Sequence, residues 1–175
     1  PISKFAHHWE ATAAVGLPRG AYHFFTLCRP GLVQAEHFMA TVPVDPSALP
    51  PVIDLEFVGN CAAPPSADIL AEVDAFSDLL EHHYGRRPLL YTTEEFYLDI
   101  LGGTVPSQEL WLRDLFGEPS YVPTGWRIWQ FHSRARIPGI DGPVDLDAFN
   151  GTRAEFEAWR TVAADTLPSA SSHWR

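Results

Sequence analysis

The stretch Leu49-Pro50-Pro51-Val52-Ile53-Asp54-Leu55-Glu56-Phe57 places two acids inside a short apolar run. Prolines precede this run and Val58-Gly59-Asn60 follows it, a pattern that predicts a buried strand. Side chains two apart on a strand point to the same face, roughly 6 to 7 Å apart, so we expect Asp54 and Glu56 to converge. Two acids buried together predict that one keeps its proton to unusually high pH. Enzymes use such pairs as acid and base; the alternative is a structural role at a strand end or in a salt bridge.

The totals of the sequence predict one globular domain. The chain has 175 residues, of which 46% are hydrophobic, and the 6 Trp and 11 Phe argue against disorder. A net charge of -10 with a single lysine, Lys4, argues against nucleic acid as a partner. No apolar run reaches the roughly 18 to 20 residues of a membrane span, and no signal peptide is visible. We expect one domain over residues 1–165 and a polar tail over residues 166–175.

The two cysteines, Cys28 and Cys61, are not spaced as metal ligands. Each follows the carboxyl end of a predicted strand, so the two meet if those strands are neighbours. They could form a disulfide or remain two buried thiols; the disulfide, if present, favours an extracytoplasmic protein. No spacing in the chain predicts a metal site, and we expect no cofactor.

Strands and helices alternate along the first two thirds of the chain, which predicts parallel strands joined by crossover helices. We expect strands at residues 20–25, 52–57, 88–92, 110–112, 126–131 and 144–149, and helices at residues 5–15, 32–41, 66–84, 94–101 and 153–163. Ser66 is the expected cap of the third helix, and Gln34 is expected on the surface of the second. The last two strands have no helix between them. The whole pattern predicts an α/β fold of the barrel type.

Polar and aromatic residues gather at or near the carboxyl ends of six predicted strands, where barrels of this type carry their sites. They are Tyr22, His23, Asp54, Glu56, Tyr91, residues 111–114, Gln130 and Asp145. The apolar neighbours of His23 favour a hydrogen-bonded core histidine over a ligand or base. Tyr22 and Tyr91 could be core aromatics, although we favour a groove lining, and Trp111 and Trp129 could pack as well as bind.

Several motifs, in order, resemble those of the family-25 glycoside hydrolases, the Chalaropsis-type lysozymes. They are Gly20-Ala21-Tyr22-His23-Phe24, Gln34-Ala35, the acidic stretch 49–56, Leu110-Trp111, Ile128-Trp129-Gln130-Phe131 and Val144-Asp145-Leu146-Asp147. The resemblance covers residues 5–159. It implies an irregular, TIM-like (β/α)5β3 barrel. It also implies an N-acetylmuramidase that cuts peptidoglycan between N-acetylmuramic acid and N-acetylglucosamine.

The resemblance also implies roles for individual residues. Glu56 would be the general acid, and Asp54 would assist by orienting the substrate acetamido group or by stabilising charge at the anomeric carbon. Asp145 would lie at the floor of the groove, and Asp147 would be structural or support another side chain. Sugar-binding or supporting positions would be Tyr22, Tyr91, Trp111 and Gln130. The implied partner is the peptidoglycan glycan strand, bound by a monomer outside the cytoplasm.

The amino end departs from the pattern of the family. Members usually begin with a strand carrying an Asp-x-Ser motif, a helix and a second strand, and none of these precedes Phe5 here. A barrel without those strands would expose apolar edges, so we expect the missing part to exist in the gene. Two alternatives remain open: a non-catalytic glycan-binding module, and a hydrolase of another N-acetylated polysaccharide such as chitin.

Overall fold

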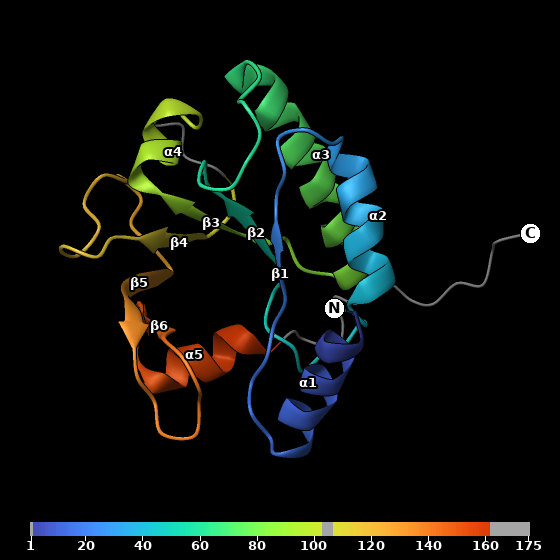
Figure 1. Cartoon of the computed structure of the whole chain (residues 1–175), viewed down its shortest axis with the longest axis vertical. Helices are drawn as coiled ribbons and strands as arrows, with labels where there is room; N and C mark the ends of the chain where they lie inside the picture. The colour runs from blue at the N-terminus through green and yellow to red at the C-terminus, as the bar shows by residue number, and fades with distance from the viewer. Residues whose placement is uncertain (1, 103–106, 162–175) are drawn as a thin grey trace, which may run out of the picture.

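The chain forms one curled sheet with helices packed against its outer face (Figure 1). The computed structural model describes residues 2–102 and 107–161. Its strands are β1 (Tyr22–Phe24), β2 (Val52–Leu55), β3 (Leu89–Thr93), β4 (Leu110–Arg113), β5 (Ile128–Ala135) and β6 (Val144–Phe149). Its helices are α1 (Ile2–Ala14), α2 (Gly31–Thr41), α3 (Ser66–Tyr84), α4 (Glu94–Asp99) and α5 (Arg153–Arg160).

The six strands lie side by side in chain order. β1 to β5 are parallel, and β6 runs antiparallel to β5. The curled sheet is half of a barrel, which confirms the predicted barrel-type α/β fold and the change of pattern before the last strand. The register places Phe24, Asp54, Tyr91 and Trp111 in one row across β1 to β4. Residues of this row therefore meet although they are far apart in sequence.

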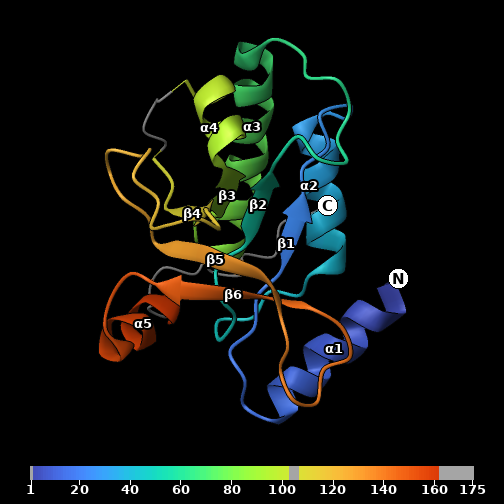
Figure 2. The ribbon, with the colours of Figure 1, turned by 60° about the vertical axis from the view of Figure 1, so that its left-hand side comes forward.

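The core lies between the sheet and helices α2, α3 and α4, which cover the same face (Figure 2). Ile53 and Leu55 of β2 are both fully buried there, as is Phe76 of α3. Helices α2 and α3 approach closely at Gly31, where an added Cβ would lie 2.0 Å from the Glu72 carbonyl oxygen. Only glycine fits at that contact, so the sequence itself sets the spacing of these helices.

The structure confirms most predicted elements and corrects two details. Ser66 begins α3 but makes no capping bond, because Pro65 occupies the cap position. Gln34 was predicted on the surface of α2 but is buried, since its side chain bonds the backbone of Thr26 and Arg29. His23 is the expected hydrogen-bonded core histidine, with Nε2 3.0 Å from Gln34 Oε1. The predicted tail at residues 166–175 lies outside the described residues. No helix in the described ranges is long and apolar enough to cross a membrane.

Cys28 and Cys61 form a disulfide, the first of the two predicted alternatives. The bridge joins the loop after β1 to the loop after β2, with the two Cα atoms 5.8 Å apart and 33 residues between the cysteines in sequence. It therefore fixes two neighbouring loops at the carboxyl edge of the sheet.

The double substitution Cys28→Ser and Cys61→Ser is expected to lower the free energy of unfolding by about 2–4 kcal/mol, because the unfolded chain gains conformational freedom. Urea denaturation of the two proteins measures this difference. Reduced wild-type protein is the control and should unfold at the same urea concentration as the double variant. Equal midpoints for the oxidised and reduced wild type would contradict the prediction.

Candidate active site

A cleft of 230 Å³ opens on the inner face of the sheet. All seven predicted site residues line it, together with Val52 of β2: Tyr22, Asp54, Glu56, Tyr91, Trp111, Gln130 and Asp145. They come from β1, β2, β3, β4, β5 and β6 or from the residue just after a strand. The structure thus gathers the whole predicted set into one site.

Strand alternation explains why the two acids face the cleft. Along β2, Ile53 and Leu55 point into the helix-covered core, so Asp54 and Glu56, which alternate with them, point to the opposite face. Asp54 is 9% exposed, and its Oδ1 has no hydrogen-bond partner among the described residues. Glu56, the residue after β2, is only half-buried. The pair therefore consists of one enclosed carboxyl group and one that is open to the cleft.

Burial raises the pKa of both acids. The pKa of Asp54 rises to about 7, first because of desolvation and second because of the charge of Glu56. Desolvation also raises the pKa of Glu56, while the positive charge of Arg113 lowers it. The pair therefore keeps a proton near neutral pH.

Two aromatic side chains form a wall of the cleft beside the acids. The rings of Tyr91 and Trp111 meet edge to face with centroids 5.5 Å apart. The Tyr91 hydroxyl donates to Gln130 Oε1 at 2.6 Å, and the Trp111 indole N–H donates to Asp147 Oδ1 at 2.9 Å. These bonds fix the orientation of the rings. Desolvation, followed by the charges of Glu56 and Asp54, raises the pKa of Tyr91, so its hydroxyl stays protonated.

The two acids of β6 differ in their contacts. Asp145 lines the cleft directly, as predicted. Asp147 contacts Trp111, which agrees with its predicted supporting position. Desolvation raises the pKa of Asp147, and the bond from Trp111 acts in the opposite direction. Trp129 is not among the residues that line the cleft. Its indole N–H donates to the Asp114 carbonyl oxygen at 2.8 Å, and its ring contacts Trp126 and Phe131.

Asn60 holds the backbone of Glu56 in place, and sequence reasoning did not identify it. Its side-chain amide donates to the carbonyl oxygens of Phe25 and Glu56 and accepts the N–H groups of Leu27 and Cys61. One amide thus joins the loops after β1 and β2 beside the disulfide. The only sequence signal was an asparagine in the turn after the acidic strand. Arg113 was also missed as an individual residue, although it lies two residues after Trp111.

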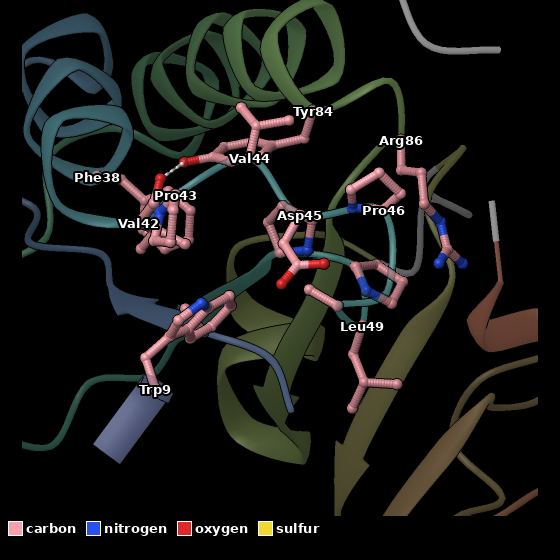
Figure 3. Close-up of a pocket in the computed structure, with 14 residues that line it drawn as sticks. Trp9, Phe38, Val42, Pro43, Val44, Asp45, Pro46, Leu49, Tyr84 and Arg86 are labelled. Atoms are coloured by element: carbon pink, nitrogen blue, oxygen red, sulfur yellow. Dashed lines mark hydrogen bonds between the residues drawn. The ribbon is translucent and has the colours of Figure 1, made fainter. Parts of the chain in front are cut away.

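A second pocket, shown in Figure 3, lies away from the acids. It surrounds the residues that precede β1 and β2, including Ala21, Pro50 and Pro51, and is covered by Trp9 of α1. Its volume is 30 Å³, enough for about two water molecules and too small for a sugar ring. The Tyr84 hydroxyl closes one side by donating to the Val42 carbonyl oxygen. This pocket is a packing feature of the sheet's opposite end.

The arrangement in the cleft suits acid–base chemistry on a bound sugar. It offers two carboxyl groups in different environments, which is how one residue type supplies an acid and an anion at the same pH. The neighbouring aromatic rings offer apolar faces to a pyranose. Within the described ranges, His, Cys, Asp and Glu side chains nowhere gather as a set of three or more that could hold a metal ion.

Comparison with known proteins places these features among glycosyl hydrolases. The family described as "Glycosyl hydrolases family 25" matches residues 3–140. An N,O-diacetylmuramidase from Chalaropsis sp is 33% identical over 158 residues, covering 77% of this chain and 74% of that protein. A solved family 25 glycosyl hydrolase from Bacillus anthracis superposes with a TM-score of 0.81 at 34% identity, covering 90% of this chain and 75% of the other.

Another relative is longer than this chain. The uncharacterized protein YegX from Escherichia coli (strain K12) is 32% identical over 156 residues, which are 89% of this chain. The match covers only 56% of the length of YegX.

Proposed function

The chain belongs to family 25 of the glycosyl hydrolases, and from this premise we propose that it is a lysozyme. Its reaction is hydrolysis of the β-1,4 bond between N-acetylmuramic acid and N-acetylglucosamine in bacterial peptidoglycan. The observation that carries this proposal is the pair Asp54 and Glu56 in a cleft lined by aromatic and amide side chains. The raised pKa of both acids supports it, because glycoside hydrolysis needs one protonated and one ionised carboxyl group.

Glu56 is the proposed general acid. It is the more open of the two carboxyl groups, so its proton can reach the glycosidic oxygen of a bound strand. Protonation makes that oxygen a leaving group, and water then completes the hydrolysis. Asp54 is the proposed assisting group, because it lies enclosed in the cleft beside Glu56. It supplies a negative charge there once its proton is released. It either orients the acetamido group of the substrate or stabilises positive charge at the anomeric carbon.

The remaining cleft residues are proposed to bind the glycan. Tyr91 and Trp111 are held by hydrogen bonds at their polar edges, which leaves ring faces for sugars. Gln130 is buried and bonded to Tyr91, so we assign it a supporting role. Tyr22 is 69% exposed at the open side of the half-barrel and is suited to a sugar ring beyond the reacting bond. Asp145 completes the cleft with a hydrogen-bond acceptor.

The proposed place of action is outside the cytoplasm, where peptidoglycan lies. The disulfide between Cys28 and Cys61 supports this, because such bonds persist in oxidising compartments.

Release of reducing ends from purified peptidoglycan tests the proposal. The protein is used in its natural full length, and chitin serves as the second substrate. We expect release from peptidoglycan, with N-acetylmuramic acid at the new reducing ends, and little release from chitin. Binding of glycan without release by the full-length protein would overturn the proposal and favour a binding module.

A further inference from the structure

Arg113 is a cationic side chain next to residues that line the cleft, and the proposed mechanism does not use it. It ends β4 two residues after Trp111, and the alternating burial of this strand places both side chains on the inner face. Its neighbours in register are Thr93 of β3 and Gln130 of β5. Arg113 is therefore next to the residues that line the site.

Among the described residues, no ion pair neutralises Arg113. The salt bridges among the described residues involve Arg19, Arg87, Arg127 and Arg160, and Arg113 is in none of them. The adjacent Asp114 instead accepts the backbone N–H groups of the next loop. A half-buried guanidinium without a partner is unusual, because its five N–H donors form strong paired bonds with carboxylates.

The charge of Arg113 acts on the cleft. It lowers the pKa of Glu56 and that of Tyr91, so its guanidinium lies close enough to influence both. For Glu56 this influence opposes the proposed role, because a general acid must keep its proton. The arginine therefore lowers the pKa of Glu56 in the free protein. A bound anion that pairs with the arginine would reduce this effect.

The other charged residues of the cleft are acidic. The acids Asp54, Glu56 and Asp145 line it, and Asp147 contacts one of its walls. Such a site repels an anionic substrate unless a cation at its edge receives the anion. The neighbouring Trp111 and Tyr91 place the proposed sugar-binding wall beside that cation.

We propose that Arg113 binds a carboxylate of the glycan substrate and makes the site select carboxylate-bearing strands over neutral ones. This inference rests on the proposed function. The carboxylate belongs either to the lactyl ether of N-acetylmuramic acid or to a peptide attached to it. The two sources share one chemistry, a planar anion that pairs with a guanidinium through two N–H donors.

Binding of that carboxylate also favours catalysis. The groups that face Glu56 are Asp54 of β2, Tyr91 of β3, Arg113 of β4 and Asp145 of β6. Of these, only Arg113 lowers the pKa of Glu56, and a bound carboxylate offsets its charge. The influence of Arg113 on the pKa of Glu56 then weakens, so Glu56 keeps the proton that the reaction needs. A neutral strand leaves Arg113 charged and the acid weaker.

The test compares three substrates with the natural full-length protein: intact peptidoglycan, strands freed of peptide, and the same strands with the lactyl carboxyl reduced to an alcohol. We expect kcat/KM to be about 10- to 100-fold higher for the carboxylate strands than for the reduced strands. Arg113→Gln should abolish this preference by slowing cleavage of the carboxylate strands, while cleavage of the reduced strands stays the same or rises. Arg113→Lys should restore part of it, and Arg153→Gln on exposed α5 is the charge-matched control.

The outcomes separate the sources and the hypotheses. If the protein prefers peptide-free strands over reduced strands, the carboxylate that Arg113 binds is the lactyl group. If it prefers only intact peptidoglycan over reduced strands, that carboxylate belongs to the peptide. Equal loss on carboxylate and reduced strands in Arg113→Gln overturns the inference. If the wild type cleaves nothing, the proposed function has failed. In that case calorimetry tests the inference separately. Tighter binding of carboxylate strands than of reduced strands by the wild type, but not by Arg113→Gln, supports it, and equal binding by the wild type contradicts it.

Discussion

The variant Glu56→Gln is expected to lose roughly 10²- to 10⁴-fold in the rate of reducing-end release from peptidoglycan. The amide keeps the shape of the side chain but has no proton to give to the glycosidic oxygen. Glycan binding should persist, because the aromatic wall and Arg113 do not depend on the acid. Steady-state release of reducing ends measures the first effect, and calorimetry with glycan fragments measures the second.

A matched control for this variant is Glu95→Gln, on the exposed side of α4. It removes the same charge outside the cleft and should retain wild-type activity. Near-native activity of Glu56→Gln would mean that the acid is assigned to the wrong residue. Equal loss of activity and binding would instead indicate a damaged cleft.

The variant Asp54→Asn is expected to be less active yet more stable above pH 7. Activity should fall roughly 10²-fold or more, because the site loses a charge positioned for the transition state. Stability should rise because the carboxyl group is enclosed and Oδ1 has no partner among the described residues. A buried ionised group without a partner destabilises the folded state, and the amide removes that charge.

The raised pKa of Asp54 determines how the stability of the folded protein changes with pH. The pKa of Asp54 is raised to about 7 in the folded protein from 3.8, so the folded state binds the proton more tightly than the unfolded state does. The resulting stabilisation is complete below about pH 4 and is lost as pH rises through 7. The difference in pKa corresponds to at most about 4 kcal/mol. Asp54→Asn should therefore show a smaller fall in stability between pH 4 and pH 8.

Urea denaturation at both pH values measures the change, and Asp141→Asn in an exposed loop is the control. A variant that is less stable than wild type at pH 8 would show that Asp54 serves folding rather than catalysis. Loss of activity together with gain of stability is the pattern of a residue kept for function.

The amino-acid sequence by itself determined the alternation of strands and helices, the barrel-type fold and the seven residues of the cleft. It could do so because strand periodicity fixes which side chains share a face, and parallel strands bring their carboxyl ends to one edge. The Asp-Leu-Glu strand could be recognised as a candidate site, because charged residues inside an apolar run are rare without a partner or a function. The ordered motifs then identified the family.

Only the tertiary structure decided how the site is tuned. Asn60 lies in an ordinary turn by sequence, and its four bonds arise because two loops fold against each other. Gln34 has the spacing of a surface residue on α2, yet the loop after β1 covers it. The unequal environments of Asp54 and Glu56, and the unpaired charge of Arg113, depend on distances between strands. The burial of a residue and the electric field at it depend on all its neighbours in space, and the spacing of residues in the sequence does not identify those neighbours.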